Sequence, residues 1–463
     1  MNALTKDNYE FFSKLLKNRV STDDDDLKKY GHDETEDILI LPGIVLKPET
    51  PEEIAAILKY CSENHLPVTP SGARTGLSGG AIPLKGGVVL SMEKFNKIIS
   101  VDTDNFQVTT EPGVITQVLQ ETVKEKGLFY PPDPASKGSC FIGGNVSENS
   151  GGPKAVKYGV TADYVLNLEV VLPTGEIIWT GANTLKNSTG YNLTQLIIGS
   201  EGTLAVVTKI VLKLIPHPTE DLLMLVPFRN AEEACTAVAQ IFKKGITPSG
   251  LEFMERDALL WTINHLGEST VQVKNDHAAH LLIEVDGFDR AQLMEDCQTI
   301  MEVIEQYDID EILFAENTSQ KEALWKLRRS VGEAVKANSI YKEEDTVVPR
   351  FELPKLLNII KKIGDKNGFK SVCYGHAGDG NLHVNIIKGD LTDDQWNNEL
   401  PFAIRELFKE VVKMGGTISG EHGIGLVQKQ YMDIPFKPVS LELMRSIKRI
   451  FDPNGILNPD KIF

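Results

Sequence analysis

The pattern of hydrophobic and polar positions changes near residue 217 of the 463-residue chain. Before this point, from Ile38 to Pro216, short apolar runs typical of strands alternate with glycine-rich stretches. Two helical patterns interrupt them, Pro51–Glu63 and Ile115–Lys126, and the first has proline in its first turn. The strands predicted in this part are Val68–Pro70, Gly87–Ser91, Gln107–Thr110, Val165–Leu172, Glu176–Trp179 and Gly202–Leu214.

Residues 220–420 alternate apolar strands with amphipathic helices, which predicts a second α+β domain with an antiparallel sheet and helices on one face. Its predicted strands are Leu222–Phe228, Leu281–Val285, Val372–His376 and His383–Ile387. Its predicted helices are Ala231–Lys243, Arg290–Tyr307, Thr318–Ala337, Pro354–Asn367 and Trp396–Met414.

The two ends of the chain have patterns of their own. Residues 1–30 predict a helix that ends in the acidic run Asp23–Asp26, and a last helix, Leu441–Phe451, precedes a turn-rich tail. We therefore expect an α+β protein in four parts. They are an N-terminal helical segment over residues 1–35, a first domain over 36–216, a second over 217–420 and a C-terminal segment over 421–463.

Composition narrows the class of protein. Apolar residues make up 41% of the chain and charged residues 24%, which is ordinary for a globular protein. The net charge of −17 argues against a nucleic-acid-binding protein, because phosphate binding needs clustered Lys and Arg. We find no apolar run near the ~18–20 residues of a membrane helix and no signal-peptide core, so we expect a cytoplasmic protein without a membrane span.

The five cysteines lie far apart and include no CxxC pair. This spacing argues against an iron–sulfur cluster, a cysteine-ligated zinc site and a disulfide framework. We expect five thiols that are mostly buried.

The stretch Ser71–Gly80 packs four glycines, two serines and a threonine between two predicted strands. Such a loop can turn its N–H groups inward and bind a diphosphate. It lacks the spacing of the Rossmann fingerprint and leads into a strand rather than a helix, and no Walker A lysine follows. A flexible hairpin loop is the alternative interpretation.

Two further clusters of small residues make that alternative weaker. One is PPDPASKGSCFIGGNVSENSGG, which begins at Pro131, and the other is the GSEG turn that precedes the predicted strand ending at Leu214. Three such loops at strand ends could together surround one long ligand that contains phosphate.

These segments resemble the FAD-binding domain of the vanillyl-alcohol-oxidase superfamily, of the PCMH type, over roughly residues 36–216. The resemblance implies that PSGARTGLSGG binds the diphosphate and that the other two clusters hold the flavin ring and the adenosine half. Because no histidine lies between His65 and His217, we expect FAD to be bound non-covalently. The residues implied in FAD binding are Pro70, Ser71, Gly72, Arg74, Thr75, Gly76, Leu77, Ser78, Pro132, Asp133, Gly138, Ser139, Gly143, Gly144, Asn145, Asn149, Gly152, Gly159, Glu201, Gly202 and Ile210.

Two compact motifs carry three of the nine histidines. In GHAGDGNLH, His376 ends one predicted strand and His383 opens the next, so a hairpin would bring both imidazoles together. In SGEHGIG, Glu421 and His422 stand among glycines. Two histidines and a carboxylate suit Zn²⁺ or Mn²⁺ and leave positions open for substrate. The alternative is a set of buried core histidines.

Both motifs resemble the C-terminal domain of FAD-linked dehydrogenases that act on D-2-hydroxy acids. The resemblance implies that His376, His383 and Glu421 bind the metal, most consistently zinc, with manganese or iron as alternatives. It also implies that His422 is the catalytic base. The ending DPNGILNPDKI resembles the ending of this family too and implies that Asn458 returns to the FAD site.

A substrate carboxylate is bound best by the planar fork of an arginine. Arg328 and Arg329 are adjacent on a predicted helix, so we expect at most one of them to reach the site. Arg328 matches the substrate-binding arginine of the family, and Asn385 is implied to lie beside the substrate. Arg350 is a second candidate, and Lys342 is a candidate for the distal carboxylate of a dicarboxylic acid.

The resemblance therefore implies an FAD- and metal-dependent dehydrogenase that oxidises D-lactate, glycolate or D-2-hydroxyglutarate to the 2-oxo acid, with hydride transfer to flavin N5. Without a cluster or nicotinamide motif, we expect an external electron acceptor: an electron-transfer flavoprotein, a quinone or an iron–sulfur subunit. Two alternatives stay open, a non-redox FAD enzyme of the ether-lipid synthase type and a flavin electron-transfer subunit. The sequence does not choose the acid, the native metal, the reactivity with oxygen or the oligomeric state, a homodimer included.

Overall fold

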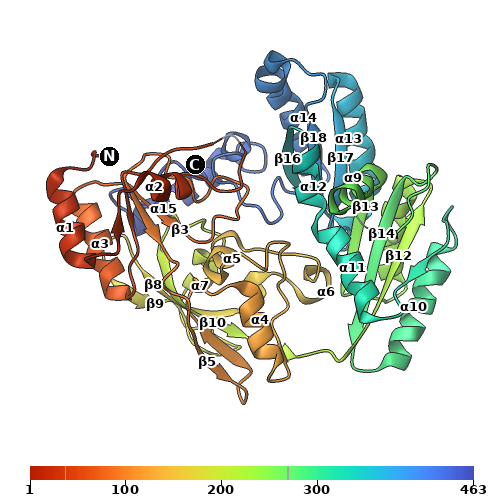
Figure 1. Cartoon of the computed structure of the whole chain (residues 1–463), viewed down its shortest axis with the longest axis horizontal. Coiled ribbons are helices and arrows are strands. Elements are labelled where there is room, and N and C mark those ends of the chain that lie inside the picture. Colours follow the sequence, from red (N-terminus) through yellow and green to blue (C-terminus); the bar gives the residue numbers. More distant parts are fainter. Residues whose placement is uncertain (37, 268, 270) are drawn as a thin grey trace. The chain divides into compact units, whose positions relative to one another are not determined.

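The structure is a computed structural model and describes residues 1–36, 38–267, 269 and 271–463. The chain folds into two compact units (Figure 1). The first unit comprises Met1–Gly151, Val160–His217 and Glu421–Phe463. The second comprises Pro218–Gly420 and a short segment, Gly152–Gly159, that leaves the first unit and returns to it.

One sheet of the first unit carries the glycine loop that begins at Ser71. Its strand order is β1-β2-β4-β3, and β4 pairs with both β2 and β3 in parallel. The loop between β3 and β4 is therefore a crossover between parallel strands, not the hairpin of the alternative interpretation. The strands are β1 (Val20–Ser21), β2 (Ile44–Leu46), β3 (Val68–Ser71) and β4 (Val88–Ser91).

A second sheet of this unit is antiparallel throughout, in the order β5-β6-β10-β8-β9. Its strands are β5 (Ile98–Asp102), β6 (Gln107–Thr110), β8 (Val165–Val171), β9 (Ile177–Trp179) and β10 (Val206–Lys213), and a two-stranded ribbon pairs β7 (Leu128–Phe129) with β11 (Ile215–Pro216). The helices of the unit are α1 (Lys6–Leu16), α2 (Asp24–Lys29), α3 (Pro51–Glu63), α4 (Thr116–Lys124), α5 (Ile142–Glu148), α7 (Leu193–Ile197) and α15 (Pro438–Phe451).

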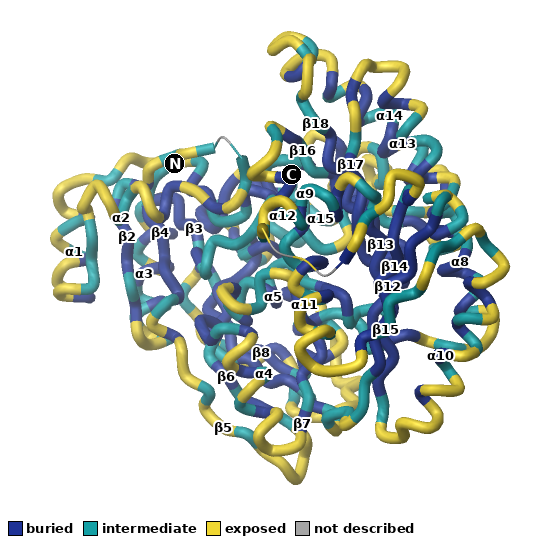
Figure 2. The backbone as a smooth tube through the Cα atoms, turned by 45° about the vertical axis from the view of Figure 1, so that its right-hand side comes forward, coloured by how far each residue is buried: buried dark blue, intermediate teal, exposed yellow. Residues whose placement is uncertain are grey.

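The second unit is built on one sheet with the strand order β15-β12-β14-β13-β17-β18-β16. All its pairings are antiparallel, as predicted. The neighbouring strands β12 and β14 are buried along most of their length (Figure 2). The strands are β12 (Glu220–Phe228), β13 (Gly250–Glu255), β14 (Ala279–Gly287), β15 (Leu313–Phe314), β16 (Tyr341–Val347), β17 (Lys370–Gly375) and β18 (Asn381–Ile387).

Helices cover both faces of this sheet rather than the one face predicted. The layer of α8, α10, α13 and α14 packs on one face, and α9, α11 and α12 pack on the other through a core that includes Leu282, Leu327 and Val335. The bounds are α6 (Ala155–Tyr158), α8 (Ala231–Lys243), α9 (Arg256–Leu266), α10 (Arg290–Ile304), α11 (Thr318–Arg329), α12 (Val331–Asn338), α13 (Leu353–Asn367) and α14 (Leu400–Lys413).

Local sequence explains where several helices begin. Thr50 caps α3 by accepting a hydrogen bond from the Glu53 N–H, and Asn230 caps α8 by accepting from two N–H groups of the first turn. The predicted helix over residues 1–30 is wrong, because β1 separates two helices and the acidic run begins α2. Acidic residues there interact favourably with the positive end of the helix dipole. In the part of the chain that the structure describes, we find no helix long and apolar enough to cross a membrane.

Candidate functional site

The glycine loops of the first unit surround a cavity with about 260 Å³ of space for water-sized molecules. Residues from all three small-residue clusters of the sequence line it. The predicted residues among them are Pro70, Ser71, Gly72, Arg74, Thr75, Gly76, Leu77, Gly143, Gly144, Asn145, Glu201 and Gly202. The fold thus brings together small-residue clusters that are about 130 positions apart in the chain.

Other predicted FAD residues lie outside the wall of this cavity. Ile210 is buried within β10, and Gly152 and Gly159 bound the short segment that belongs to the second unit. Asn458 does not line the cavity, but its Nδ2 donates to the backbone oxygens of two lining residues, Gly80 and Glu201. Also outside the wall are Ser78, Pro132, Asp133, Gly138, Ser139 and Asn149.

The cavity suits the phosphates of a dinucleotide. The Ser71 hydroxyl lines it and is buried without a hydrogen-bond partner among the described residues. No other atom lies within 4 Å of the position that a Cβ would take at Gly76 or Gly144. Phosphate oxygens are acceptors that hydroxyl and backbone N–H groups can satisfy. The residues present therefore fit FAD.

Two carboxylic acids of the cavity wall stand beside each other at Gly423. A Cβ on Gly423 would lie 2.2 Å from Glu148 Oε2 and 3.1 Å from Glu201 Oε1. Burial raises the pKa of Glu201 above its ordinary value, and hydrogen bonds from the N–H groups of Ile424 (2.8 Å) and Gly425 (2.6 Å) oppose this shift. Burial and the neighbouring charge of Glu201 raise the pKa of Glu148 well above its ordinary value. Glu201 is among the FAD-binding residues expected from the sequence, whereas Glu148 is not, although it lies within the second glycine cluster.

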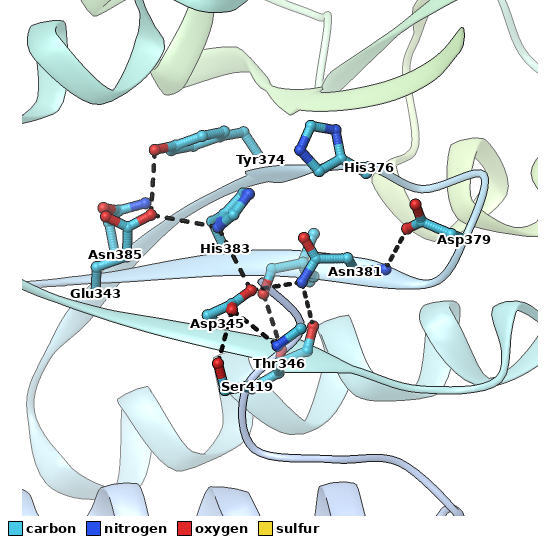
Figure 3. A network of polar contacts seen from close by, with 12 residues as sticks. Glu343, Asp345, Thr346, Tyr374, His376, Asp379, Asn381, His383, Asn385 and Ser419 are labelled. Carbon is cyan, nitrogen blue, oxygen red and sulfur yellow. Dashed lines mark hydrogen bonds and ion pairs between the residues drawn. The ribbon is translucent and has the colours of Figure 1, made fainter. Parts of the chain in front are cut away.

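In the second unit the predicted hairpin forms and brings the two histidines together (Figure 3). His383 of β18 pairs with Tyr374 of β17, and His376 follows directly after β17. The centroids of the His376 and His383 rings are 5.5 Å apart, and the rings are nearly perpendicular. Both histidines are buried.

A carboxylate is within hydrogen-bond distance of the His376 Nδ1 atom, and two others lie at longer range from the His383 Nδ1 atom. His376 Nδ1 lies 2.8 and 2.9 Å from the carboxylate oxygens of Glu252, a buried residue of β13. His383 Nδ1 lies 3.4 Å from Glu343 and 3.8 Å from Asp345, both on β16. A carboxylate on one ring nitrogen fixes the tautomer and orients the other nitrogen toward a metal. The histidine pair therefore fits a divalent metal bound through Nε2.

These carboxylates were not found from the sequence. The segments that became β13 and β16 were not predicted as strands, so the alternation that directs Glu343 and Asp345 to one face was overlooked. Tyr374 donates a hydrogen bond to Glu343 at 3.3 Å (Figure 3). Burial, together with the Glu343 charge, raises the pKa of Tyr374 well above its ordinary value.

Arg328 joins this cluster from α11. Its guanidinium lies 2.6 Å from Glu252 and stacks over the ring of Tyr374, 5.2 Å from the ring centroid. Arg328 is 4% exposed, and its buried Nε has no hydrogen-bond partner among the residues that the structure describes. Arg329 instead stacks over Trp325 at 5.3 Å, as expected for adjacent positions of a helix.

Asn385 lies on the same sheet face as His383, two residues further along β18. Its side chain is fully buried, and its Nδ2 donates to the backbone oxygen of Val372 at 3.3 Å. Its Oδ1 has no hydrogen-bond partner among the described residues. A ligand that donates a hydrogen bond would satisfy this oxygen.

Two predicted substrate contacts are not placed with the histidines. Lys342 pairs with Ile386 in the sheet and so points to the opposite face, where its Nζ donates to the backbone oxygen of Trp396 at 3.1 Å. Arg350 stacks at 3.8 Å from the ring centroid of Phe242 in α8. Side chains alternate between the two faces along a strand, and β16 was not predicted as a strand, so the sequence did not indicate which face Lys342 takes.

Glu421 and His422 begin the last stretch of the first unit, where both line the cavity of the glycine loops. The residue before them, Gly420, ends the second unit, and its N–H donates to Asp345 at 2.8 Å. The Ser419 hydroxyl donates to the same carboxylate at 3.1 Å.

Comparisons with known proteins show the family to which the chain belongs. The family described as FAD linked oxidases, C-terminal domain, matches residues 217–462, and the family described as FAD binding domain matches residues 42–181. The chain is 38% identical to a D-lactate dehydrogenase of Anaerostipes hadrus, with 100% of this chain and 98% of the relative covered. It is 38% identical to the glycolate oxidase subunit GlcD of Bacillus subtilis, covering 94% and 92%. It is 34% identical to a D-2-hydroxyglutarate dehydrogenase of Stutzerimonas stutzeri, covering 96% of each chain.

Solved structures show the same fold at low identity. A p-cresol methylhydroxylase structure matches with a TM-score of 0.79 and 19% identity, covering 99% of this chain and 97% of that chain. An alkyldihydroxyacetonephosphate synthase structure matches with a TM-score of 0.76 and 18% identity, covering 99% and 86%. The protein belongs to the FAD-linked oxidases and is an FAD-linked oxidoreductase of the D-lactate, glycolate and D-2-hydroxyglutarate dehydrogenase type.

Proposed function

We propose that this protein is a dehydrogenase that oxidises a D-2-hydroxy acid, such as D-lactate, glycolate or D-2-hydroxyglutarate, to the 2-oxo acid. The observation that carries the proposal is the cluster of His376, His383 and Arg328, with Glu252 contacting both His376 and Arg328. A cationic fork beside a metal-binding histidine pair suits a molecule that carries a carboxylate next to a hydroxyl.

The glycine loops of the first unit would hold FAD without a covalent bond. In this proposal the loop that follows Ser71 receives the diphosphate through its N–H groups, and Ser71 contributes its unpartnered hydroxyl. When bound, FAD supplies the acceptor for a hydride from the substrate Cα at its N5. Reoxidation by an external carrier, an electron-transfer flavoprotein, a quinone or an iron–sulfur subunit, completes the proposed cycle.

His376, His383 and Glu421 would hold a divalent metal, for which zinc is the first candidate. Glu421 is included because its motif SGEHGIG lies within the segment that matches the FAD linked oxidases, C-terminal domain. When bound, the metal supplies Lewis-acid polarisation of the substrate hydroxyl.

His422 would accept the proton of the substrate hydroxyl at a ring nitrogen. It lines the glycine-loop cavity and follows directly after Glu421 in the chain. Arg328 would bind the substrate carboxylate through its unpartnered Nε, and Asn385 would accept a hydrogen bond from the substrate at Oδ1. General-base help of this kind contributes about 10²–10⁴-fold in rate.

The first test is the visible spectrum of the purified protein under anaerobic conditions. D-lactate, L-lactate, glycolate and D-2-hydroxyglutarate are added separately, before and after treatment with a chelator. We expect one D-acid, or glycolate, to bleach the flavin bands and chelation to abolish the bleaching. A flavin spectrum that none of the acids bleaches would contradict the dehydrogenase proposal and favour a non-redox or electron-transfer role.

The role of His422 needs a separate variant. His422→Ala should lower the rate of flavin reduction by about 10²–10⁴-fold, because the base is lost. The variant should keep the flavin spectrum and the metal content of the wild type. A rate within a few-fold of the wild type would exclude His422 as the base while leaving the overall reaction intact.

A further inference from the structure

The C-terminal tail of the chain lies against the glycine loop of the first unit. The N–H of Asn458 donates to the Val68 oxygen at 2.7 Å, which extends the sheet edge at β3. Near the other end of the tail, the N–H of Ile462 donates to the Gly425 oxygen at 3.0 Å. Lys461, between these two anchors, therefore has a fixed backbone.

The Lys461 side chain is buried, with 3% of its surface exposed, and its ammonium group ends inside the loop. Its Nζ donates to three backbone oxygens, those of Gly79 (2.5 Å), Gly80 (3.1 Å) and Ile82 (2.8 Å). An ammonium group has three donors, so these three carbonyls use all of them. The geometry is that of a clamp on three peptide groups within four residues of the loop.

A clamp on carbonyl oxygens also sets the direction of N–H groups. In a planar trans peptide the C=O of one residue and the N–H of the next point in opposite directions. With the oxygens of Gly79 and Gly80 turned toward Lys461, the N–H groups of Gly80 and Ala81 point away from it. Gly80 and Ala81 both line the cavity. The Ala81 N–H donates to the Asp33 carboxylate at 3.4 Å, so the Gly80 N–H is the one of the two that the clamp directs toward a ligand.

Glycine is needed where the loop is clamped. Gly79 has a φ of +78°, a backbone conformation that other residues adopt rarely. Such a loop has many accessible conformations when nothing holds it, and ordering it on binding would cost entropy. A contact that orders the loop beforehand lowers that cost.

Three acids surround the ammonium group at longer range. Burial lowers the pKa of Lys461 to about 8, and the charges of Asp33, Glu201 and Glu148 oppose this shift. These same three acids line the cavity. A buried cation in this place thus also offsets part of the negative charge that a diphosphate would meet.

We propose that Lys461 is a positioning residue for FAD, which holds the glycine loop so that its N–H groups face the diphosphate. The inference rests on the proposal that this loop binds the FAD diphosphate. Lys461 itself contacts only protein in this role. Its effect should therefore appear in cofactor affinity before it appears in any chemical step.

The test is a fluorescence titration of the apoprotein with FAD, for the wild type and Lys461→Met. The control is Lys85→Met, which removes an ion pair of Lys85 with Asp460, the residue next to Lys461. Both side chains of that pair are about half exposed, at 45% and 47%, so we expect the control to bind FAD as the wild type does. For Lys461→Met we expect the Kd for FAD to rise at least tenfold and competition by ADP to weaken in parallel, because ADP carries the diphosphate.

Circular dichroism of each apoprotein separates positioning from folding. If Lys461→Met does not fold, Lys461→Gln takes its place, because its shorter, neutral side chain still removes the ammonium group and at least one of its three contacts. A Kd for FAD in the folded variant equal to that of the control would overturn the inference. A wild-type protein that binds no FAD would instead overturn the proposed function.

Discussion

Replacing Glu252 with Gln perturbs the support of the histidine pair without changing its shape. The Glu252 side chain is completely buried, and its oxygens contact His376 Nδ1 at 2.8 and 2.9 Å and the Arg328 guanidinium at 2.6 Å. The amide of glutamine keeps one acceptor oxygen but removes the negative charge. Two separate consequences follow, one for metal affinity and one for stability.

The size of each consequence can be worked out from these contacts. Loss of a carboxylate behind a metal-binding histidine costs about 10–100-fold in metal affinity, or about 1.4–2.7 kcal/mol. Arg328 is 4% exposed, so Glu252→Gln leaves its charge buried and without its carboxylate partner. Breaking a buried pair in this way destabilises a protein by about 3–5 kcal/mol.

Glu284→Gln is the matched control. Glu284 is also buried in the same sheet and paired, at 2.6 Å with Lys154 and through a hydrogen bond from Trp325 Nε1 at 2.7 Å. We expect both variants to lose free energy of unfolding in urea. Only Glu252→Gln should lose affinity for zinc, measured by competition with a chromophoric chelator.

Two results would refute the reasoning. Unchanged zinc affinity in folded Glu252→Gln would show that this carboxylate does not orient His376 for a metal. An equal loss of affinity in both variants would show that the effect comes from general destabilisation of the sheet rather than from the contact with the histidine ring.

Three further predictions address other parts of the molecule. All five cysteines are buried, and burial raises the pKa of the Cys297 thiol to about 11, so about 0.1% of this thiol is ionised at pH 8. The cysteines of the native protein should not react with a thiol reagent within minutes, whereas all five cysteines should react after denaturation. Burial alone would raise the pKa of Asp286, but Lys154 and a neighbouring lysine lower it below its ordinary value. The ionised Asp286 should therefore stabilise the folded protein fully above about pH 4, and this stabilisation should disappear as the pH falls through the native pKa. The difference in unfolding free energy between wild type and Asp286→Asn should accordingly shrink in acid. Gly380 has a φ of +89°, and a Cβ there would lie 1.9 Å from the Val348 oxygen. Gly380→Ala should therefore distort the histidine hairpin and lower both the melting temperature and the zinc content. A variant in which both values are unchanged would contradict this prediction.

Much of the chemistry was readable in the sequence because it depends on local spacing. The six residues between His376 and His383 contain a turn, and a hairpin across that turn brings the two rings together whatever the rest of the fold does. Glycine-rich loops at strand ends likewise indicated a phosphate-binding cavity. Helix starts such as the Thr50 cap are decided within four residues.

Other features could not be predicted from the sequence because they depend on partners far away in the chain. Glu252 lies 124 positions from His376, and no local pattern connects the two. The segment that contains Lys342 was not recognised as a strand, so nothing indicated which sheet face this side chain takes. Once β16 pairs with β18, the register decides that Glu343 and Asp345 face the histidines and Lys342 does not.

The sequence by itself determined the glycine-rich loops and the two histidine motifs and, through them, the kind of chemistry. The tertiary structure alone decided which carboxylates orient the histidines, and that Lys461 at the end of the chain clamps a loop near its beginning. The physical reason is that hydrogen bonds act over about 3 Å in space, and packing, not position along the chain, brings such groups together.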